Sequence, residues 1–358
     1  MADDRTAGAG HYRYPGLDFL RALAIVLVVN CHAVTAFGSP AEYRALQLGG
    51  KGVDLFFVLS GWLLGRQLMR ELRDTGTIDL RRFWYRRWLR TLPAYYAVLA
   101  FTFAWQLAKG NRDLRWSYWF FGQTYLTDLP YFSVSWSLCV EEHFYLAVAP
   151  LLLLFWRVRL ALVLLPLLLA LPVVCRVMGW YFHDAGIETH ARYDPCAVGV
   201  LLAAIDVALP RVWAFLRKAA PFLALAGLAG ASCDVLCRLN PQWGLGDQDT
   251  LAWALIFGSW VLLAAARPEW AIGRLPGVRY IAERSYAVYL LHPEAFAVLR
   301  KVEGLPFGAH LALTWALSVL LAEILFRLVE RPGMLLRERF GASKSRDPVP
   351  PATPAQGA

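Results

Sequence analysis

Charged side chains are scarce in this sequence, and with them the usual signs of a soluble protein. Asp, Glu, Lys and Arg make up 18% of the 358 residues, apolar residues make up 58%, and the mean hydropathy is +0.42. Soluble domains carry about 25% charged residues. Apolar segments recur from residue 17 to residue 329. These features exclude a chain of two or three soluble domains and indicate an all-α polytopic integral membrane protein.

Metal-site and secretion signals are also missing from the sequence. The six cysteines lack the spacing of metal ligands, so we expect them to pack as small apolar residues and expect no bound metal. The first sixteen residues are polar and no small-residue cleavage site follows the first apolar stretch, so we expect no signal peptide. The net charge of +9 is explained by basic cytoplasmic loops, and we therefore expect no nucleic-acid partner.

About ten apolar stretches predict membrane-spanning helices. They lie at residues 17–37, 53–70, 93–109, 136–156, 159–178, 194–209, 219–237, 250–266, 281–299 and 308–329. Together they form one membrane domain at residues 17–332, between a cytoplasmic tail at 1–16 and a second cytoplasmic tail at 333–358. The second tail is basic and then rich in Pro and Ala, so we expect it to be disordered. The aromatic stretch at 116–125 is too short to span and is expected at the outer interface.

The distribution of Arg and Lys predicts the orientation in the bilayer. With the N-terminus inside, the cytoplasmic segments hold far more basic residues than the outer segments do. The segment after the second span alone contains Arg66, Arg70, Arg73, Arg81, Arg82, Arg86, Arg87 and Arg90. Because basic residues concentrate in cytoplasmic loops, we expect an even number of spans with both termini in the cytoplasm.

The first span carries a cation and an imidazole, both of which are costly at membrane depth. Arg21 and His32 lie eleven residues apart, which on a helix places them on one face and roughly 16 Å apart along the axis. Snorkelling at the interface explains Arg21 as well as a functional role does. For His32 we favour a functional role.

Acidic side chains and a second imidazole are predicted at the depth of His32, in the outer half of the bilayer. They come from four other segments and comprise Asp54, Glu141, Glu142, Asp194 and His292. Ion pairing for packing would explain one or two of them. Two histidines with several acids indicate instead a site that handles protons.

A basic pair is predicted at the opposite, cytoplasmic face. Arg87 and Arg90 lie three residues apart, on one side of a helix, where their forked donors suit phosphate oxygens. Arg beside Trp at a cytoplasmic interface is also ordinary lipid anchoring, so both interpretations stay open.

Seven motifs occur in a fixed order along residues 15–332. They are Arg21-x10-His32, Gly52 to Gly61 with Asp54, Phe83 to Pro93 with Arg87-x-x-Arg90, Trp136 to Tyr145 with Glu141-Glu142, Arg192-Tyr-Asp194, Ser285 to Pro293 with His292, and Glu330-Arg-Pro332. In these motifs and their order the chain resembles the integral-membrane acyltransferase-3 family.

The resemblance implies a ten-span enzyme of the bacterial inner (cytoplasmic) membrane. Such an enzyme moves an acyl group, usually acetyl from acetyl-CoA, to a hydroxyl of a carbohydrate or glycolipid, most often at the cell surface. Some members carry a fused extracytoplasmic esterase-like domain. We expect no such domain here, so any second transfer step is expected either to need a separate partner or not to occur.

The residues also suggest how an acyl-CoA-dependent O-acyltransferase would work. An alcohol needs a base to become a nucleophile at neutral pH, and imidazole is suited to that task. His32 is our candidate, as the base or as the group that accepts the acyl group first. Asp54 or Glu141 would fix its tautomer, with Glu142 in the same acidic cluster. His292 is a second base, an acceptor-binding group or a packed histidine.

The donor is predicted to bind at the other end of the first span. Arg87 and Arg90 would hold the phosphates of acyl-CoA, with Arg21 as a third cation. A proton-coupled transporter is the alternative function, because it too would place imidazoles and carboxylates inside the membrane. Against it, no inverted repeat and no matched pair of broken helices is detectable. The sequence selects no acceptor, acyl-chain length or oligomeric state.

Overall fold

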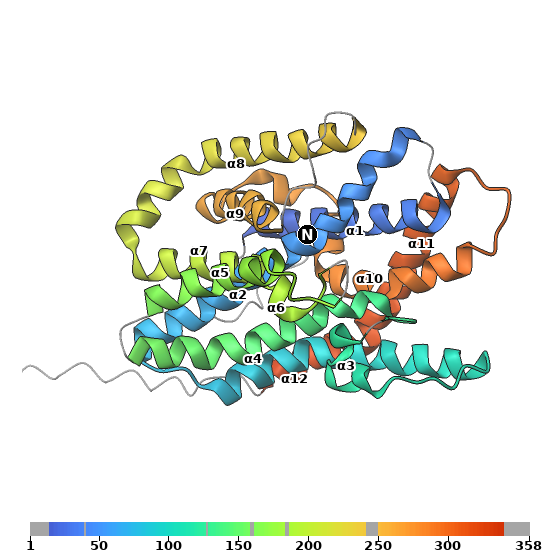
Figure 1. Cartoon of the computed structure of the whole chain (residues 1–358), viewed down its shortest axis with the longest axis horizontal. Helices are drawn as coiled ribbons and strands as arrows, with labels where there is room; N and C mark the ends of the chain where they lie inside the picture. Colours follow the sequence, from blue (N-terminus) through green and yellow to red (C-terminus); the bar gives the residue numbers. More distant parts are fainter. Residues whose placement is uncertain are drawn as a thin grey trace, which may run out of the picture.

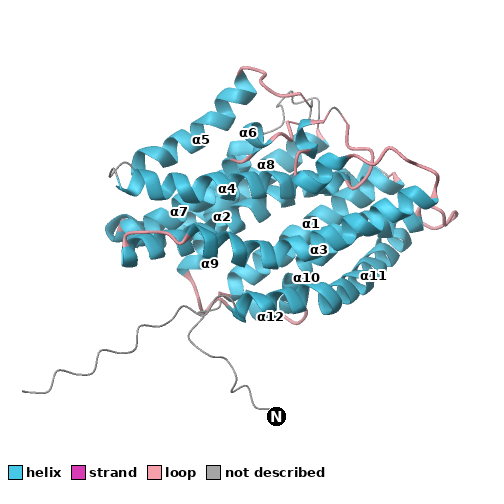
Figure 2. Cartoon of the chain, turned by 90° about the horizontal axis from the view of Figure 1, so that it is seen from below, coloured by secondary structure: helices cyan, strands magenta, loops and turns pink. Residues whose placement is uncertain are grey.

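The computed structural model describes residues 14–38, 41–126, 128–157, 161–182, 186–240 and 250–339, and this part of the chain contains helices and no strand (Figure 2). The α-helices are α1 (Pro15–Phe37), α2 (Gly52–Thr75), α3 (Leu80–Ala108), α4 (Trp136–Arg157), α5 (Ala161–Val177), α6 (Thr189–Arg192), α7 (Asp194–Ala208), α8 (Pro210–Leu239), α9 (Thr250–Ala266), α10 (Val278–Leu299), α11 (Phe307–Leu325) and α12 (Arg331–Arg339). Short 3₁₀ segments lie at Ala41–Lys51, Trp116–Phe120, Gln123–Tyr125, Ser133–Ser135 and Ala271–Arg274, and a π-helical turn lies at Phe326–Glu330.

A helix lies over each of the ten predicted ranges, which confirms the all-helical architecture. Five helical stretches are long and apolar enough to cross a membrane, namely Pro15–Phe37, Ala45–Thr75, Ser133–Trp156, Pro210–Leu239 and Phe307–Arg339. The stretches Val163–Val177 and Thr250–Ala266 are apolar but shorter. Ten crossings and two cytoplasmic termini stay predictions, and residues 1–13 and 340–358 lie outside the described residues.

Helices α1 and α2 form the centre of the bundle. Figure 1 shows α8 and α9 on one side of this pair and α3 and α4 on the other. The larger apolar core packs α1 and α2 against α3, α4 and α10, through side chains such as Ile25, Phe57 and Tyr95. The smaller core packs them against α7 and α9, through side chains such as Trp62 and Phe257. Residues on α1 and α2 can therefore reach groups from both halves of the chain.

Small residues let α2 and α7 approach closely. A Cβ atom added at Gly61 would lie 2.2 Å from the Cys196 carbonyl oxygen, and one added at Gly199 would lie 2.3 Å from the Val58 carbonyl oxygen. Gly61 and Gly65 are four residues apart, the spacing with which membrane helices bring backbones together. This contact holds the start of α7 beside the start of α2.

The connection between α3 and α4 contains the stretch 116–125, whose place at the outer interface stays a prediction, and it is partly buried against the protein. Trp116 and Phe120 are exposed, but Tyr118, Gln123 and Thr124 are buried. The Tyr118 hydroxyl donates a hydrogen bond to the Tyr131 carbonyl at 2.6 Å. The connection therefore packs into the protein, and α4 begins beneath it instead of at the surface.

Part of the predicted C-terminal tail is also folded. Residues 331–339 form α12, which lies beside α3 (Figure 1). A Cβ atom at Gly333 would lie 2.7 Å from the Leu89 carbonyl oxygen, so the two helices touch backbone to backbone there. The disordered tail predicted at 333–358 thus begins with a docked helix, and residues 340–358 lie outside the described residues.

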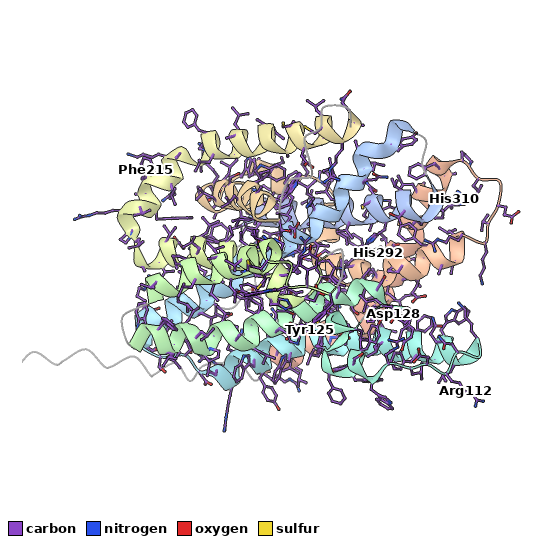
Figure 3. The ribbon with its side chains drawn as sticks, viewed as in Figure 1. Arg112, Tyr125, Asp128, Phe215, His292 and His310 are labelled. Atoms are coloured by element: carbon purple, nitrogen blue, oxygen red, sulfur yellow. The ribbon has the colours of Figure 1, made fainter. Side chains whose placement is uncertain are left out.

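The predicted orientation can be tested by cysteine labelling. With the six native cysteines replaced, single cysteines at Thr75 and Arg112 would occupy exposed positions, and Figure 3 shows Arg112 at the edge of the molecule. We expect an impermeant maleimide added to intact spheroplasts to label position 112 at once and position 75 only after permeabilisation. Labelling of position 75 from outside would contradict the predicted orientation and indicate the inverted one.

Candidate active site

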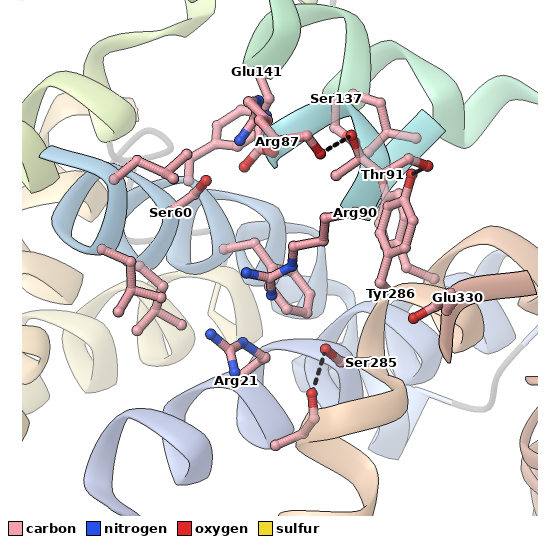
Figure 4. Close-up of a pocket in the computed structure, with 18 of the residues that line it drawn as sticks. Arg21, Ser60, Arg87, Arg90, Thr91, Ser137, Glu141, Ser285, Tyr286 and Glu330 are labelled. Carbon is pink, nitrogen blue, oxygen red and sulfur yellow. Dashed lines mark hydrogen bonds and ion pairs between the residues drawn. The ribbon is translucent and has the colours of Figure 1, made fainter. Parts of the chain in front are cut away.

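A cavity of about 190 Å³ lies among α1, α2, α3, α4, α10 and the C-terminal helical segments (Figure 4). Its wall contains Arg21, Arg87 and Arg90, the three side chains that the sequence assigns to phosphate binding. They come from two helices, α1 and α3. The structure thus places all three arginines around one cavity, although their other contacts differ.

Arg87 is held by two carboxylates. Its Nη2 atom lies 3.0 Å from Glu141 Oε2 and 3.1 Å from Glu142 Oε1, and its guanidinium lies 4.2 Å from the centre of the Tyr145 ring. Arg87 is only 7% exposed. The prediction that the arginine pair and the span-4 acids occupy opposite membrane faces is therefore wrong. They meet because α4 begins beneath the buried connection, well inside the protein.

The other acids of the predicted proton-handling cluster are also paired with arginines. Asp54 lies 3.1 Å from Arg192, and Asp194 lies 2.9 Å from Arg176. Both carboxylates are fully buried. Ion pairing, which the sequence suggested for one or two of these acids, accounts for all four.

The imidazole of His32 is paired with a second imidazole and not with a carboxylate. His32 Nδ1 lies 2.6 Å from His292 Nε2, and neither Asp54 nor Glu141 hydrogen-bonds to it. The ring planes differ by 6° and the centroids are 4.9 Å apart. Because that separation equals the nitrogen–nitrogen distance plus a ring radius at each end, the rings meet edge to edge in one plane. The expectation that Asp54 or Glu141 fixes the tautomer of His32 is wrong.

His292 is fully buried in the interior of the molecule (Figure 3), whereas His32 is half-buried. Tyr289 connects this histidine pair to the cavity. Its side chain lines the cavity, its hydroxyl lies 2.7 Å from Ser137 Oγ, and its carbonyl oxygen lies 2.8 Å from His292 Nδ1. The histidine pair therefore stands directly behind the cavity wall.

Sequence reasoning missed two basic residues of the cavity, Arg86 and Arg337. Arg337 projects from α12, in the segment predicted to be disordered, so no pattern in the sequence assigned it a place. Within the described part of the chain, neither Arg337 nor Arg90 makes a hydrogen bond or an ion pair, and the Nε atom of Arg337 is buried. Arg90 and Arg337 are thus cations without a protein counter-charge in contact, unlike Arg87.

Glu330 is an acidic residue in the wall of the same cavity. It ends the π-helical turn, lines the cavity and is 7% exposed, with a buried Oε1 atom that has no hydrogen-bond partner. Single π turns inside helices often occur at functional sites. No group of three His, Cys, Asp or Glu residues among those described could hold a metal ion.

A model of the acyltransferase domain matches residues 14–326 of this chain. The chain is 26% identical over 361 residues to the peptidoglycan O-acetyltransferase OatA of Listeria monocytogenes, covering 92% of this chain and 57% of that protein. It is 27% identical to the putative peptidoglycan O-acetyltransferase YrhL of Bacillus subtilis, covering 90% of this chain and 55% of that protein. It is 28% identical to the O-acetyltransferase OatA of Staphylococcus aureus, with coverages of 89% and 57%.

The chain therefore spans a little over half the length of these relatives. No solved structure matches it. Nothing in these comparisons supports the transporter alternative.

Arg87 should contribute far more to stability than Arg90 does. Arg87→Ala leaves the buried carboxylate of Glu142 and the half-buried carboxylate of Glu141 without their cation, and removal of one partner from a buried ion pair costs about 3–5 kcal/mol. Arg90→Ala removes no ion pair. We expect thermal unfolding in detergent to show a large fall in Tm for Arg87→Ala and little change for Arg90→Ala or for the exposed control Arg339→Ala. Equal Tm values for the first two variants would show that the Arg87 pairs contribute little.

Proposed function

Because the chain belongs to the acyltransferase-3 family, we propose that it is a membrane-embedded O-acetyltransferase, with acetyl-CoA as donor and a hydroxyl of a cell-envelope polysaccharide as acceptor. The relatives named for peptidoglycan O-acetylation support a cell-wall glycan as the acceptor. The long apolar helices support a membrane location, which we assign to the bacterial inner (cytoplasmic) membrane. The observation that carries the proposal is the arrangement along α1. Arg21, which lies 3.4 Å from Asp18, lines the cavity that also contains Arg90 and Arg337. His32 lies on the same face of α1, roughly 16 Å further along the helix axis, beside a second imidazole.

The cavity offers the charge that a nucleotide-type donor needs. Coenzyme A carries a pyrophosphate and a ribose phosphate, and guanidinium forks bind phosphate oxygens with two parallel hydrogen bonds. Arg90 and Arg337 are free of ion pairs among the described residues, and Arg86 lines the same wall. We assign the phosphates to these side chains. Arg87 has a structural role instead, because its charge is already balanced by Glu141 and Glu142.

The proposed reaction begins at His32. Its imidazole takes the proton of the acceptor hydroxyl, and the oxygen attacks the thioester carbonyl carbon. The new C–O bond forms, the C–S bond breaks, and the imidazolium returns the proton to the departing thiolate, so that the products are the acetyl ester and free coenzyme A. In the covalent route the basic ring nitrogen of His32 attacks the thioester carbon instead, the C–S bond breaks and the coenzyme A thiolate leaves. The acceptor hydroxyl then attacks the acyl-imidazole, which frees the ring, and its proton passes to the thiolate. The Asp54 and Glu142 carboxylates take no part in these steps, because each is paired with an arginine.

The function is tested with purified protein in nanodiscs, labelled acetyl-CoA and soluble peptidoglycan fragments. We expect wild-type protein to transfer label to the glycan, with a mass increase of one acetyl group. His32→Ala should lower the rate by about 10²–10⁴-fold, which is the usual contribution of a general base, and should leave donor binding intact. Label on the protein before acceptor is added would identify the covalent route. No transfer by wild-type protein to any envelope glycan, or full transfer by His32→Ala, would contradict the proposal.

The donor site is tested by comparing two ligands. Loss of a charge-assisted contact costs about 1.5–3 kcal/mol, so Arg90→Ala and Arg337→Ala should each weaken coenzyme A binding by roughly 10- to 100-fold. Pantetheine lacks the nucleotide phosphates, and its affinity should not change in either variant. Arg339→Ala, on the same helix as Arg337 but exposed, is the matched control. Titration calorimetry in phosphatidylcholine nanodiscs measures the affinity of each ligand for the wild-type protein and for each variant. An equal loss of affinity for coenzyme A and for pantetheine would show that these arginines do not bind the phosphates.

A further inference from the structure

The imidazole of His292 is anchored by a backbone carbonyl that a proline leaves free. In an α-helix the carbonyl of Tyr289 would accept the N–H of residue 293, but that residue is Pro293 and has no N–H. His292 Nδ1 takes its place, at 2.8 Å from the Tyr289 carbonyl oxygen and 3.2 Å from that of Val288. The His-Pro dipeptide thus supplies both the vacant acceptor and the donor that fills it.

This anchor determines where the protons lie in both rings. A carbonyl oxygen can only accept, so His292 Nδ1 carries the hydrogen. In a neutral imidazole the other nitrogen is then an acceptor, and His292 Nε2 presents its lone pair to His32. His32 Nδ1 must therefore be the donor of the 2.6 Å hydrogen bond. The remaining nitrogen of His32, Nε2, is left with a free lone pair.

We propose that His292 and Pro293 act together as a tautomer lock that keeps the lone pair of His32 on Nε2. His292 is then a positioning residue, and it fixes the tautomer of His32 as the carboxylate of a serine hydrolase triad fixes that of its histidine. The lock itself follows from the hydrogen bonds, whereas its catalytic consequence rests on the proposed function, in which His32 is the base.

A neutral partner suits the place where this pair lies. The carboxylates Asp54, Glu141 and Glu142 are all in contact with guanidiniums. A further ionised acid beside His32 would need its own cation at membrane depth, which is costly. An imidazole that is held by a carbonyl fixes the tautomer without adding charge. The in-plane meeting of the two rings directs the lone pair of His292 at the N–H of His32.

Two amide substitutions test whether His292 acts through its hydrogen bond to His32 or only by filling space. In His292→Gln the side-chain oxygen reaches the position of Nε2 and can accept from His32. In His292→Asn the amide reaches only the position of Nδ1, so it can bond the Tyr289 carbonyl but not His32. We expect His292→Gln to keep kcat within about tenfold of wild type and His292→Asn to lower it on the order of 10²-fold, with coenzyme A affinity unchanged in both. Equal kcat values for these two variants would overturn the proposal.

Pro293→Ala tests the role of the proline. The restored N–H competes for the Tyr289 carbonyl, so we expect kcat to fall several-fold while Tm stays level or rises, because proline disfavours a helix interior. Pro221→Ala, inside α8 and away from the histidine pair, should leave kcat unchanged. Wild-type kcat in Pro293→Ala would exclude the proline from the lock.

The tautomer can be read without any turnover. In ¹⁵N-histidine-labelled protein, solid-state NMR distinguishes a protonated from a bare ring nitrogen, and the spectra of His32→Gln and His292→Gln assign the two rings by difference. We expect the Nδ1-protonated form for both residues. A spectrum with the hydrogen of His32 on Nε2 would overturn the lock. Correct tautomers in a protein that transfers no acetyl group would overturn the proposed function and leave the lock in place.

Discussion

The apolar interior tolerates ionised groups only in pairs, and this constraint determines which side chains of the chain are available to a ligand. Arg87 is buried between two carboxylates, and Asp54 and Asp194 are each buried beside an arginine. Removing one member of such a pair strands a charge in a medium that cannot solvate it. These pairs therefore hold the helices that carry them in fixed positions relative to one another. The cations that lack such partners, Arg90 and Arg337, line the cavity instead.

Two sites of different character follow from this division. The cavity concentrates positive charge near the ends of α3 and α12, where a phosphate would meet several guanidinium donors. The histidine pair lies where α1 meets α10, further along α1 than Arg21, and two neutral imidazoles add no charge there. Tyr289 belongs to both, because its side chain forms part of the cavity wall and its carbonyl anchors His292. A donor held by its phosphates in the cavity would be directed toward the imidazoles.

The sequence predicted part of this arrangement and not the rest. The shared face of Arg21 and His32 follows from helix periodicity, and the structure keeps Arg21 at the cavity and His32 beyond it. The partner of His32 was not predictable in this way, because His292 lies 260 residues further on and the depth of a residue in a span does not identify its neighbour. Arg337 was missed because a short basic helix after a span has the same composition as a disordered tail.

The sequence by itself determined that the chain is helical and membrane-embedded, because runs of apolar residues of bilayer length leave the backbone no other way to satisfy its hydrogen bonds. It also determined the chemistry that is present, including the vacant carbonyl that Pro293 creates within its own helix. Only the tertiary structure decided which charges pair and which remain free. That choice depends on where each helix begins relative to its neighbours. The buried connection before α4 and the docking of α12 on α3 determine those positions through contacts between residues distant in the sequence.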